Sequence, residues 1–340
     1  MNIFGKKLKL AISADGNSNI VTVLLDGLPA GTKADLDKIN ERMTEPLSGL
    51  SELGIDKRST EPPAIVSGIE NGRLTGLPLV ALIKCTAENP SANPDVLVPG
   101  TDDLALYLGN CGNTGAYSGR RDAALLFAGA VAEELLIKYG ISLFSEIMQI
   151  GEAKYDSTAD SPDMEMKKAL LDARGGGDSV GCTILCRAKG VPAGLGSPAF
   201  YGLESAISAL VFSVPGVKGV QFGAGFGFAA MKGSTANDSI VLKDDKIKAE
   251  TNMSGGIDCG ISNGEEIVLS CALRPTPHIT RQQNTVNTKT MQSEELRLRG
   301  RTEACLGPRA LQLIKAAVAL CIADAVLIKN LKAEGETDGK

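Results

Sequence analysis

The stretch between Val191 and Asn263 is the most informative part of this sequence, because glycine-rich segments are dense in it. It is introduced by Gly190-Val191-Pro192-Ala193-Gly194-Leu195-Gly196 and contains Ser254-Gly255-Gly256-Ile257 near its end. Glycine adopts backbone angles that other residues avoid, so such segments form tight turns and let the backbone approach a partner closely. Loops of this kind can offer N–H groups to an anion or to the edge of a flat ring. Plain tight turns remain the alternative interpretation.

Around this stretch, strand-like and helix-like segments follow each other without a regular order. Apolar β-branched runs predict strands at 8–12, 20–25, 64–68, 79–83, 180–188, 217–222 and 267–273. Apolar spacing and capping residues predict helices at 35–43, 122–139, 164–173, 197–213 and 307–331. This mixed order favours an α+β fold over a doubly wound parallel sheet. We expect one domain over residues 1–332 and a polar tail over 333–340.

Composition narrows the classes of function. The 340 residues include 35 Lys+Arg and 40 Asp+Glu, a formal charge of -5, which gives no basic surface for nucleic acid. The N-terminus lacks a signal-peptide pattern, and we expect no run to reach the ~18 apolar residues of a membrane helix. Eight cysteines without a Cys-x-x-Cys pair indicate reduced core thiols. We therefore expect a cytoplasmic protein without membrane or nucleic-acid partners.

Two common kinds of site find little support. The single histidine, His278, leaves too few ligands for a multi-histidine metal site, so we expect no metal. Gly223-Ala224-Gly225-Phe226-Gly227 superficially resembles a dinucleotide-binding fingerprint. We expect no helix to begin there and residues 228–231 to continue as a strand, which argues against a Rossmann site.

Several independent motifs occur in an order that closely resembles the chorismate synthase family. They cover nearly the whole chain and include Asp26-Gly27-Leu28-Pro29-Ala30-Gly31, Ala128-Gly129-Ala130-Val131-Ala132, Gly190 to Gly196, Thr251-Asn252, Arg274-Pro275-Thr276-Pro277, and Gly300-Arg301 with Cys305 and Arg309. The resemblance implies the chorismate synthase fold, with helices packed between antiparallel sheets, assembled as a homotetramer.

The resemblance also implies a function. The family binds reduced FMN and eliminates phosphate and a proton from 5-enolpyruvylshikimate 3-phosphate, which gives chorismate without net redox change. A member would thus be a carbon–oxygen lyase of the shikimate pathway, acting in aromatic amino acid biosynthesis on a small anionic cyclohexene-type substrate. Carried over by position, the FMN-binding residues would be Ser118, Gly119, Arg120, Thr251, Asn252, Ser254, Gly255, Arg274, Thr276 and Arg301.

Three catalytic positions depart from the family pattern. Asn17 and Thr101 stand where the family has its two catalytic histidines, and Glu303 replaces an aspartate thought to act through the flavin. Neither Asn nor Thr titrates near neutral pH, so neither donates a proton as imidazole does. Glu303 keeps the carboxylate on a longer stem and is the best remaining candidate for chemistry.

Cations for an anionic substrate are also fewer than in the family. Only Arg42 remains near the family's arginine-rich run, and Arg121 stands where the family has a glutamate. Anionic groups could still be held by Arg120, Arg121, Arg301 and Arg309, with Lys57-Arg58 as further candidates. His278 is either a partly exposed turn residue or a contact to the flavin phosphate.

Three functions remain open. The chain is a lyase of the chorismate synthase type with weak or altered activity, a diverged flavoenzyme with different chemistry, or a non-catalytic paralogue that binds flavin or a related ligand. A second copy with both histidines in the same genome would separate these hypotheses, because that copy would carry out the standard reaction and leave this chain free to differ. An acid–base group contributes about 10²–10⁴-fold to a rate, so the loss of two should lower turnover strongly.

Overall fold

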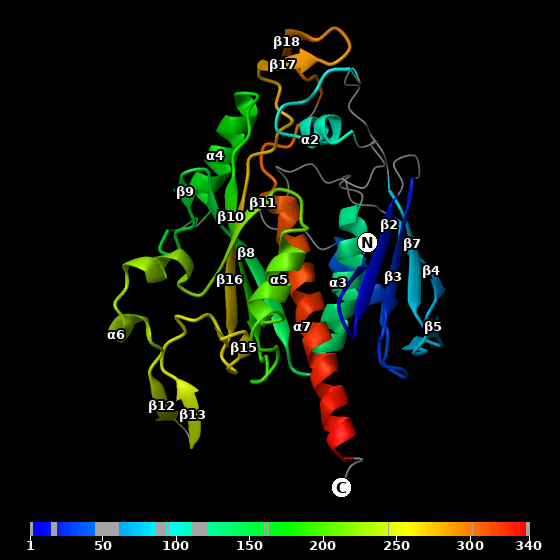
Figure 1. Ribbon diagram of the computed structural model, residues 1–340, viewed down its shortest axis with the longest axis vertical. Helices are drawn as coiled ribbons and strands as arrows, with labels where there is room; N and C mark the ends of the chain where they lie inside the picture. Colours follow the sequence, from blue (N-terminus) through cyan, green and yellow to red (C-terminus); the bar gives the residue numbers. More distant parts are fainter. Residues whose placement is uncertain are drawn as a thin grey trace.

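Two five-stranded antiparallel sheets face each other across a layer of helices (Figure 1). The computed structural model describes residues 3–14, 19–44, 61–85, 93, 95–110, 121–159, 161, 163–243, 245–300 and 302–337, with side chains as far as Asn330. The first sheet has the order β1 (Ile3–Phe4), β2 (Lys9–Ala14), β3 (Ile20–Asp26), β7 (Leu79–Lys84) and β4 (Ala64–Ser67). The second has the order β11 (Val217–Phe222), β16 (Ile267–Leu273), β10 (Cys182–Lys189), β8 (Ser142–Ile150) and β9 (Ala153–Lys154).

Alternating side chains turn one face of each sheet toward the helices. On β3, Val21, Val23 and Leu25 are fully buried, while the residues between them are partly exposed. Successive side chains of a strand point to opposite faces, so this period of two places one apolar face on the core. Strands β10 and β16 show the same alternation, and they pair in antiparallel register.

Two long helices fill the space between the sheets. Helix α3 (Arg121–Ile137) packs on β2 and β3, and helix α7 (Gly307–Thr337) packs on β8 and β10. They approach each other closely at Gly129, where a Cβ atom would lie 2.2 Å from the Cβ of Ala316. Gly129 is therefore required for the close approach of the two helices. Figure 1 shows that both helices run in the same direction, with their N-terminal ends at the top.

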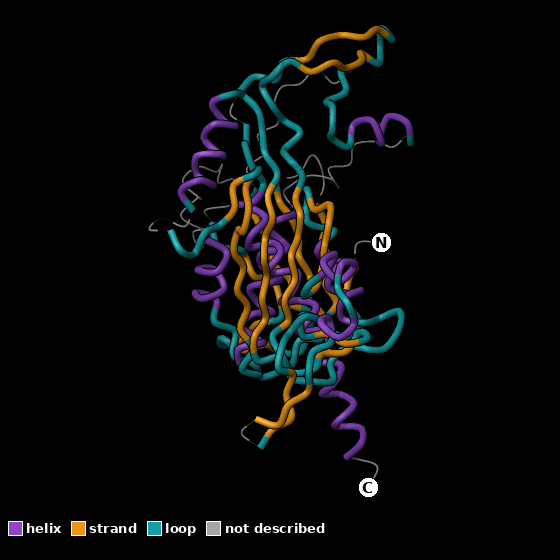
Figure 2. The backbone as a smooth tube through the Cα atoms, turned by 90° about the vertical axis from the view of Figure 1, so that its left-hand side faces the viewer, coloured by secondary structure: helices purple, strands orange, loops and turns teal. Residues whose placement is uncertain are grey.

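The remaining elements surround this core. Further helices are α1 (Leu36–Thr44), which packs on α3, and α5 (Leu203–Val211), which packs on α7, together with α2 (Asp103–Leu108), α4 (Met164–Gly175) and α6 (Gly233–Ala236). Short hairpins are formed by β5 (Ile69–Glu70) with β6 (Arg73–Leu74), β12 (Ile240–Lys243) with β13 (Lys246–Ala249), β14 (Ile257–Asp258) with β15 (Ile261–Ser262), and β17 (Gln283–Asn287) with β18 (Gln292–Leu296). Figure 2 shows that β17–β18 and β12–β13 project from opposite ends of the molecule.

Most predicted elements are confirmed, and the differences have local causes. The predicted helix 197–213 begins only at Leu203, because the carbonyl of Gly260 accepts the N–H groups of Ser197 (3.3 Å) and Leu203 and holds the preceding loop. The predicted strand at 228–231 is wrong. A 3₁₀ helix, η2 (Gly225–Ala230), forms there instead. Helix α7 continues to Thr337, into the segment expected to be a tail.

Helix α7 contradicts the expectation that no run has the length and apolar composition of a membrane helix. Its part Gly307–Asn330 is long and apolar enough to cross a membrane by length and composition. However, 89% of its apolar window is buried inside the molecule, between the second sheet and α3. The apolar composition of α7 is thus accounted for by its central place in the core.

A carboxylate on α7 holds the first sheet to the helix layer. The side chain of Asp324 accepts hydrogen bonds from three successive backbone N–H groups, those of Lys6 (3.0 Å), Lys7 (2.7 Å) and Leu8 (2.7 Å). These residues form the turn between β1 and β2, and Leu8 itself is buried. Hydrogen bonds to a charged acceptor are stronger than neutral ones, so this contact fixes the turn to α7.

We expect Asp324→Ala to lower the free energy of unfolding by roughly 3 kcal/mol, because three partly or fully buried N–H donors lose their acceptor. Asp324→Asn keeps one acceptor oxygen and should lose about half as much. Urea unfolding followed by circular dichroism measures both changes. The exposed Glu165→Gln serves as control and should leave the midpoint unchanged. An Asp324→Ala protein as stable as the control would contradict this role.

Candidate functional site

The N-terminal ends of α3 and α7 bring three charged side chains together. Asp122 precedes Gly129 by seven residues, and Arg309 precedes Ala316 by seven. Each separation is about two helical turns, or roughly 10 Å along the helix axis. Asp122 and Arg309 therefore lie at the same level along the two parallel helices, on the sides that face each other at the Gly129–Ala316 contact. Glu303 follows from the loop that leads into α7. The packing of the helices thus places Asp122, Arg309 and Glu303 side by side.

Arg309 contacts both carboxylates with one edge of its guanidinium. Its Nε lies 3.7 Å from Oδ2 of Asp122, and its Nη2 lies 3.6 Å from Oε2 of Glu303. The side chains are 11% and 12% exposed for the two acids and 27% for the arginine. Both distances exceed those of hydrogen bonds, so Arg309 acts on the two acids mainly through its charge. Oδ2 of Asp122 has no hydrogen-bond partner among the described residues.

Burial makes Asp122 an unusual acid. Removal from water raises the pKa of its carboxyl to about 6, against the lowering effect of Arg309 and with a further raising effect of Glu303. Desolvation disfavours the charged form, and a second carboxylate nearby does the same. Asp122 therefore changes its charge close to the range in which histidine does. The sequence did not predict Asp122 as a site residue. The one signal for it is that it directly follows the segment 118–121, which contains predicted cofactor-binding residues.

Arg274 extends this end of the molecule toward helix α2. Its Nη1 donates a hydrogen bond to the carbonyl of Gly100 (2.7 Å), and a Cβ at Gly100 would lie 2.7 Å from its Nη2. Arg274 also adjoins the loop before α7, because a Cβ built on Gly216 would lie 2.3 Å from the side chain of Leu306 and 4.0 Å from that of Arg274. The end of β16 thus contributes an arginine beside the Glu303 loop.

Thr101 serves the turn before α2. Its hydroxyl donates to the carbonyl of Val98 (2.7 Å) and accepts the N–H of Asp103 (3.2 Å). Through Gly100, the same turn is bound to Arg274. The structure therefore brings Thr101 and Arg274 to one loop pair, with the Thr101 hydroxyl occupied in local hydrogen bonds.

Thr276 offers a buried hydroxyl in the same region. The residue is 7% exposed, and its Oγ1 has no hydrogen-bond partner among the described residues. The backbone carbonyl of Thr276 accepts a hydrogen bond from the Ser179 hydroxyl (2.7 Å). Val180, which follows Ser179 in the chain, donates its N–H to the backbone carbonyl of Ala304 (2.8 Å). Thr276 is thus connected through Ser179 and Val180 to the loop that carries Glu303. His278 lies in the bend beyond it and is partly buried.

The second group of predicted cofactor residues lies at the other end of β16. Asp238 binds the Thr251 hydroxyl and the backbone N–H of Ser254. Asn252 bridges the carbonyl of Glu266 and the N–H of Gly256. These contacts hold the loop 251–256, including Gly255, against the start of β16, whereas Arg274 follows its end. The seven residues of that strand separate the two groups by roughly 20 Å within one chain.

Five predicted site residues lie outside the described residues, namely Asn17, Ser118, Gly119, Arg120 and Arg301. Residues 57 and 58 also lie outside them. Arg121 begins α3, next to Asp122. The roles expected of these residues stay predictions.

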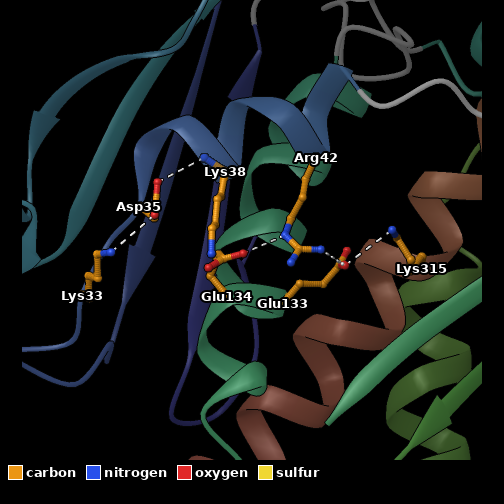
Figure 3. A network of polar contacts seen from close by, with 7 residues as sticks. All are labelled: Lys33, Asp35, Lys38, Arg42, Glu133, Glu134 and Lys315. Carbon is orange, nitrogen blue, oxygen red and sulfur yellow. Dashed lines mark hydrogen bonds and ion pairs between the residues drawn. The ribbon is translucent and has the colours of Figure 1, made fainter. Parts of the chain in front are cut away.

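Arg42, which remains near the family's arginine-rich run, is bound to two acids of the helix layer (Figure 3). Its guanidinium lies 3.0 Å from Glu133 and 2.9 Å from Glu134, both on α3. Lys315 of α7 contacts Glu133 from the other side at 3.5 Å. This cluster joins α1, α3 and α7, so Arg42 serves the packing of the helices.

The part of this end around Arg274 suits an anionic cofactor, whereas the charge of Arg309 is already balanced by Asp122 and Glu303. Helices carry partial positive charge at their N-termini, and both α3 and α7 begin here. Arg274 adds a positive charge, and Thr276 adds a hydroxyl that has no hydrogen-bond partner among the described residues. The arrangement fits the phosphate of a flavin nucleotide, with Arg274 and Thr276 as the described residues that would hold it.

The two sheets and the enclosed helix layer define an α+β protein, and the predicted fold class is confirmed. A crystal structure of a chorismate synthase has the same fold, with a TM-score of 0.72 at 23% identity over 96% of this chain and 93% of that one. A sequence model of the chorismate synthase family matches residues 8–327.

Curated relatives agree with this match. The chorismate synthase of Thermococcus gammatolerans is 34% identical over 345 residues, which cover 95% of this chain and 97% of the relative. That of Archaeoglobus fulgidus is 34% identical over 355 residues, covering 97% and 98%. The chain belongs to the chorismate synthase family.

The raised pKa of Asp122 predicts how stability changes with pH. Because the folded-state pKa of Asp122, about 6, lies above the ordinary value of 3.8, the folded state binds more protons between these values, and the free energy of unfolding falls as pH rises through them. Asp122→Asn cannot ionise. Its stability relative to wild type should therefore increase by about 2.5 kcal/mol between pH 4 and pH 7.

Chemical unfolding at a series of pH values measures this difference. Asp37→Asn, in the exposed first turn of α1, is the matched control and should follow wild type at every pH. A stability difference between Asp122→Asn and wild type that stays constant from pH 4 to pH 7 would contradict the raised pKa.

Proposed function

We propose that this protein is an FMN-dependent lyase of the chorismate synthase type. It eliminates phosphate and a proton from 5-enolpyruvylshikimate 3-phosphate or a related cyclohexene acid, with weak or altered activity. Family membership supports the reaction class, and the observation that carries the proposal is the carboxylate of Glu303, held beside Arg309 at the shared end of α3 and α7. The buried reduced thiols are consistent with a cytoplasmic location.

Each described residue has a definite task in this proposal. Reduced FMN, when bound, would assist the departure of phosphate without net redox change. Arg274 and Thr276 hold anionic oxygen, because a desolvated anion needs charge-assisted donors. Glu303 accepts the proton, since Arg309 favours its ionised form. Thr101 only shapes the turn before α2, which leaves the position of an expected catalytic histidine without an acid or base.

We further propose that the protein acts as a homotetramer. The loop 251–256 and Arg274 lie at opposite ends of β16, so both could contact one FMN only if they came from different copies. The β12–β13 hairpin supports assembly, because Ile240, Leu242 and Ile247 on it are 78%, 73% and 79% exposed. Apolar side chains gathered on a projecting hairpin indicate a surface that another chain covers.

We expect the protein to bind FMN saturably, with fluorescence quenching as the measurement. Arg274→Gln should weaken binding about tenfold or more, the value of one charge-assisted hydrogen bond. Arg281→Gln, which removes the same charge from an exposed ion pair with Asp178, is the control and should bind like wild type. If a tetramer forms the site, affinity should also fall when dilution dissociates the assembly. Absence of saturable binding in either redox state would favour a paralogue that binds no flavin.

Turnover of 5-enolpyruvylshikimate 3-phosphate should be well below the normal range of the family. A placed acid–base group contributes about 10²–10⁴-fold, and this chain has Asn17 and Thr101 where two are expected. The double variant Asn17→His/Thr101→His should gain more than either single variant. Anaerobic assays of chorismate formation with reduced FMN measure these rates.

Two results would count against this expectation. A wild-type rate in the normal range would show that this scaffold does not need the histidines. No gain from the double variant would indicate a pocket altered for another substrate, as expected of a diverged flavoenzyme.

A further inference from the structure

Two acids, Asp122 and Glu303, lie beside the same arginine, and the proposed function assigns no role to Asp122. Asp122 and Glu303 both lie against the Nε/Nη2 edge of Arg309, at 3.7 Å and 3.6 Å. These two nitrogens are neighbours on one side of the planar guanidinium, so the two carboxylates lie close together. Two carboxylates therefore act on the same guanidinium in a region largely shielded from water, and Glu303 and Arg121 have further interactions of their own.

The charge balance of this cluster depends on a single proton. With Asp122 protonated, Arg309 and Glu303 form a neutral pair. With Asp122 ionised, the three groups carry a net charge of -1 in a buried place, which is costly unless a proton returns. Arg121 on α3 lowers the cost, and Cys305 is the other titratable group influenced by Glu303. Two interacting acids of this kind titrate as a pair rather than independently.

One carboxylate oxygen of Asp122 lacks a hydrogen-bond partner among the described residues. This oxygen is Oδ2, and its contact with Arg309 is longer than a hydrogen bond. By contrast, the buried Glu133 has both Arg42 at 3.0 Å and Lys315 at 3.5 Å. Buried acids with a purely structural role normally have close polar partners, as Glu133 does. The poor satisfaction of Asp122 is typical of a group whose charge is meant to change.

We propose that Asp122 is a positioning residue that shares Arg309 with Glu303 and thereby strengthens Glu303 as a proton acceptor. This inference rests on the proposed function. An isolated glutamate is a weak base at neutral pH, and an arginine paired with it alone weakens it further. The negative charge of Asp122 offsets that effect and raises the affinity of Glu303 for a proton. In a chain with one histidine, the acid pair would supply the basicity that imidazole supplies elsewhere.

The first test measures the pair itself and needs no substrate. Infrared difference spectra between pH 4 and pH 8 report the C=O stretch of protonated carboxyls. Wild type should show a buried carboxyl that takes up a proton near pH 6, where the pKa of Asp122 lies. In Glu303→Gln this midpoint should move to lower pH, because the neighbouring negative charge is gone. In Asp122→Asn the midpoint near pH 6 should disappear, and Glu303 should take up its proton at lower pH than it does in wild type.

The infrared experiment has one control variant and two results that would overturn the proposal. Asp37→Asn should leave the buried band unchanged. An Asp122 midpoint equal in wild type and Glu303→Gln would overturn the coupling, as would a wild type without a buried carboxyl titrating near pH 6. Should Asp122→Asn fail to fold, the comparison of wild type with Glu303→Gln still decides the question.

The second test uses the pH profile of turnover. The wild-type kcat should rise with pH through the midpoint of Asp122, and Asp122→Asn should lose this rise and fall about tenfold at pH 8, with KM changed less than twofold. A purely structural role of Asp122 would lower kcat equally at every pH, which would contradict the proposal. If no substrate is converted, the proposed function fails while the infrared result still confirms or refutes the acid pair.

Discussion

The close contact between Gly129 of α3 and Ala316 of α7 determines most of this structure. A side chain at Gly129 would overlap Ala316, so the two helix axes lie nearer to each other than larger residues allow. This packing fixes the thickness of the helix layer, and each sheet covers one side of it. It also sets the N-terminal ends of both helices at the same height, because Asp122 and Arg309 lie seven residues before the contact on their own helices.

Charges buried along this helix pair are of two kinds. Below the contact, Glu133 is compensated by Arg42 and Lys315, which come from α1 and α7 (Figure 3). At the N-terminal end, Asp122 and Glu303 both lie beside the guanidinium of Arg309. The first arrangement stabilises the assembly of three helices, since each charge has partners at short distance. The second leaves an acid whose pKa is raised to about 6, and this is the property that chemistry at neutral pH requires.

The fold could be predicted from the sequence because its determinants are local. Strands such as Val217–Phe222 and Ile267–Leu273 have the expected bounds, because their apolar β-branched runs specify them locally. The close packing of Gly129 on Ala316 was not predicted, because it depends on how two helices meet. The acid pair could not be predicted, because it depends on helix register. Nothing near Asp122 in the sequence indicates that Arg309 lies beside it. The 3₁₀ helix at Gly225–Ala230 was missed because positive φ angles at Gly223 and Gly225 turn the chain out of the strand.

Hydrogen–deuterium exchange with and without FMN tests the central claim that the site lies where α3 and α7 begin. The account predicts slower exchange, on binding, in the turn that carries Thr101, in the segment after Arg274 and in the first turns of both helices. Protection of the loop 251–256 in addition would show that a second copy completes the site. Protection confined to that loop, with exchange at the helix ends unchanged, would contradict the account and place the site at the opposite end of β16.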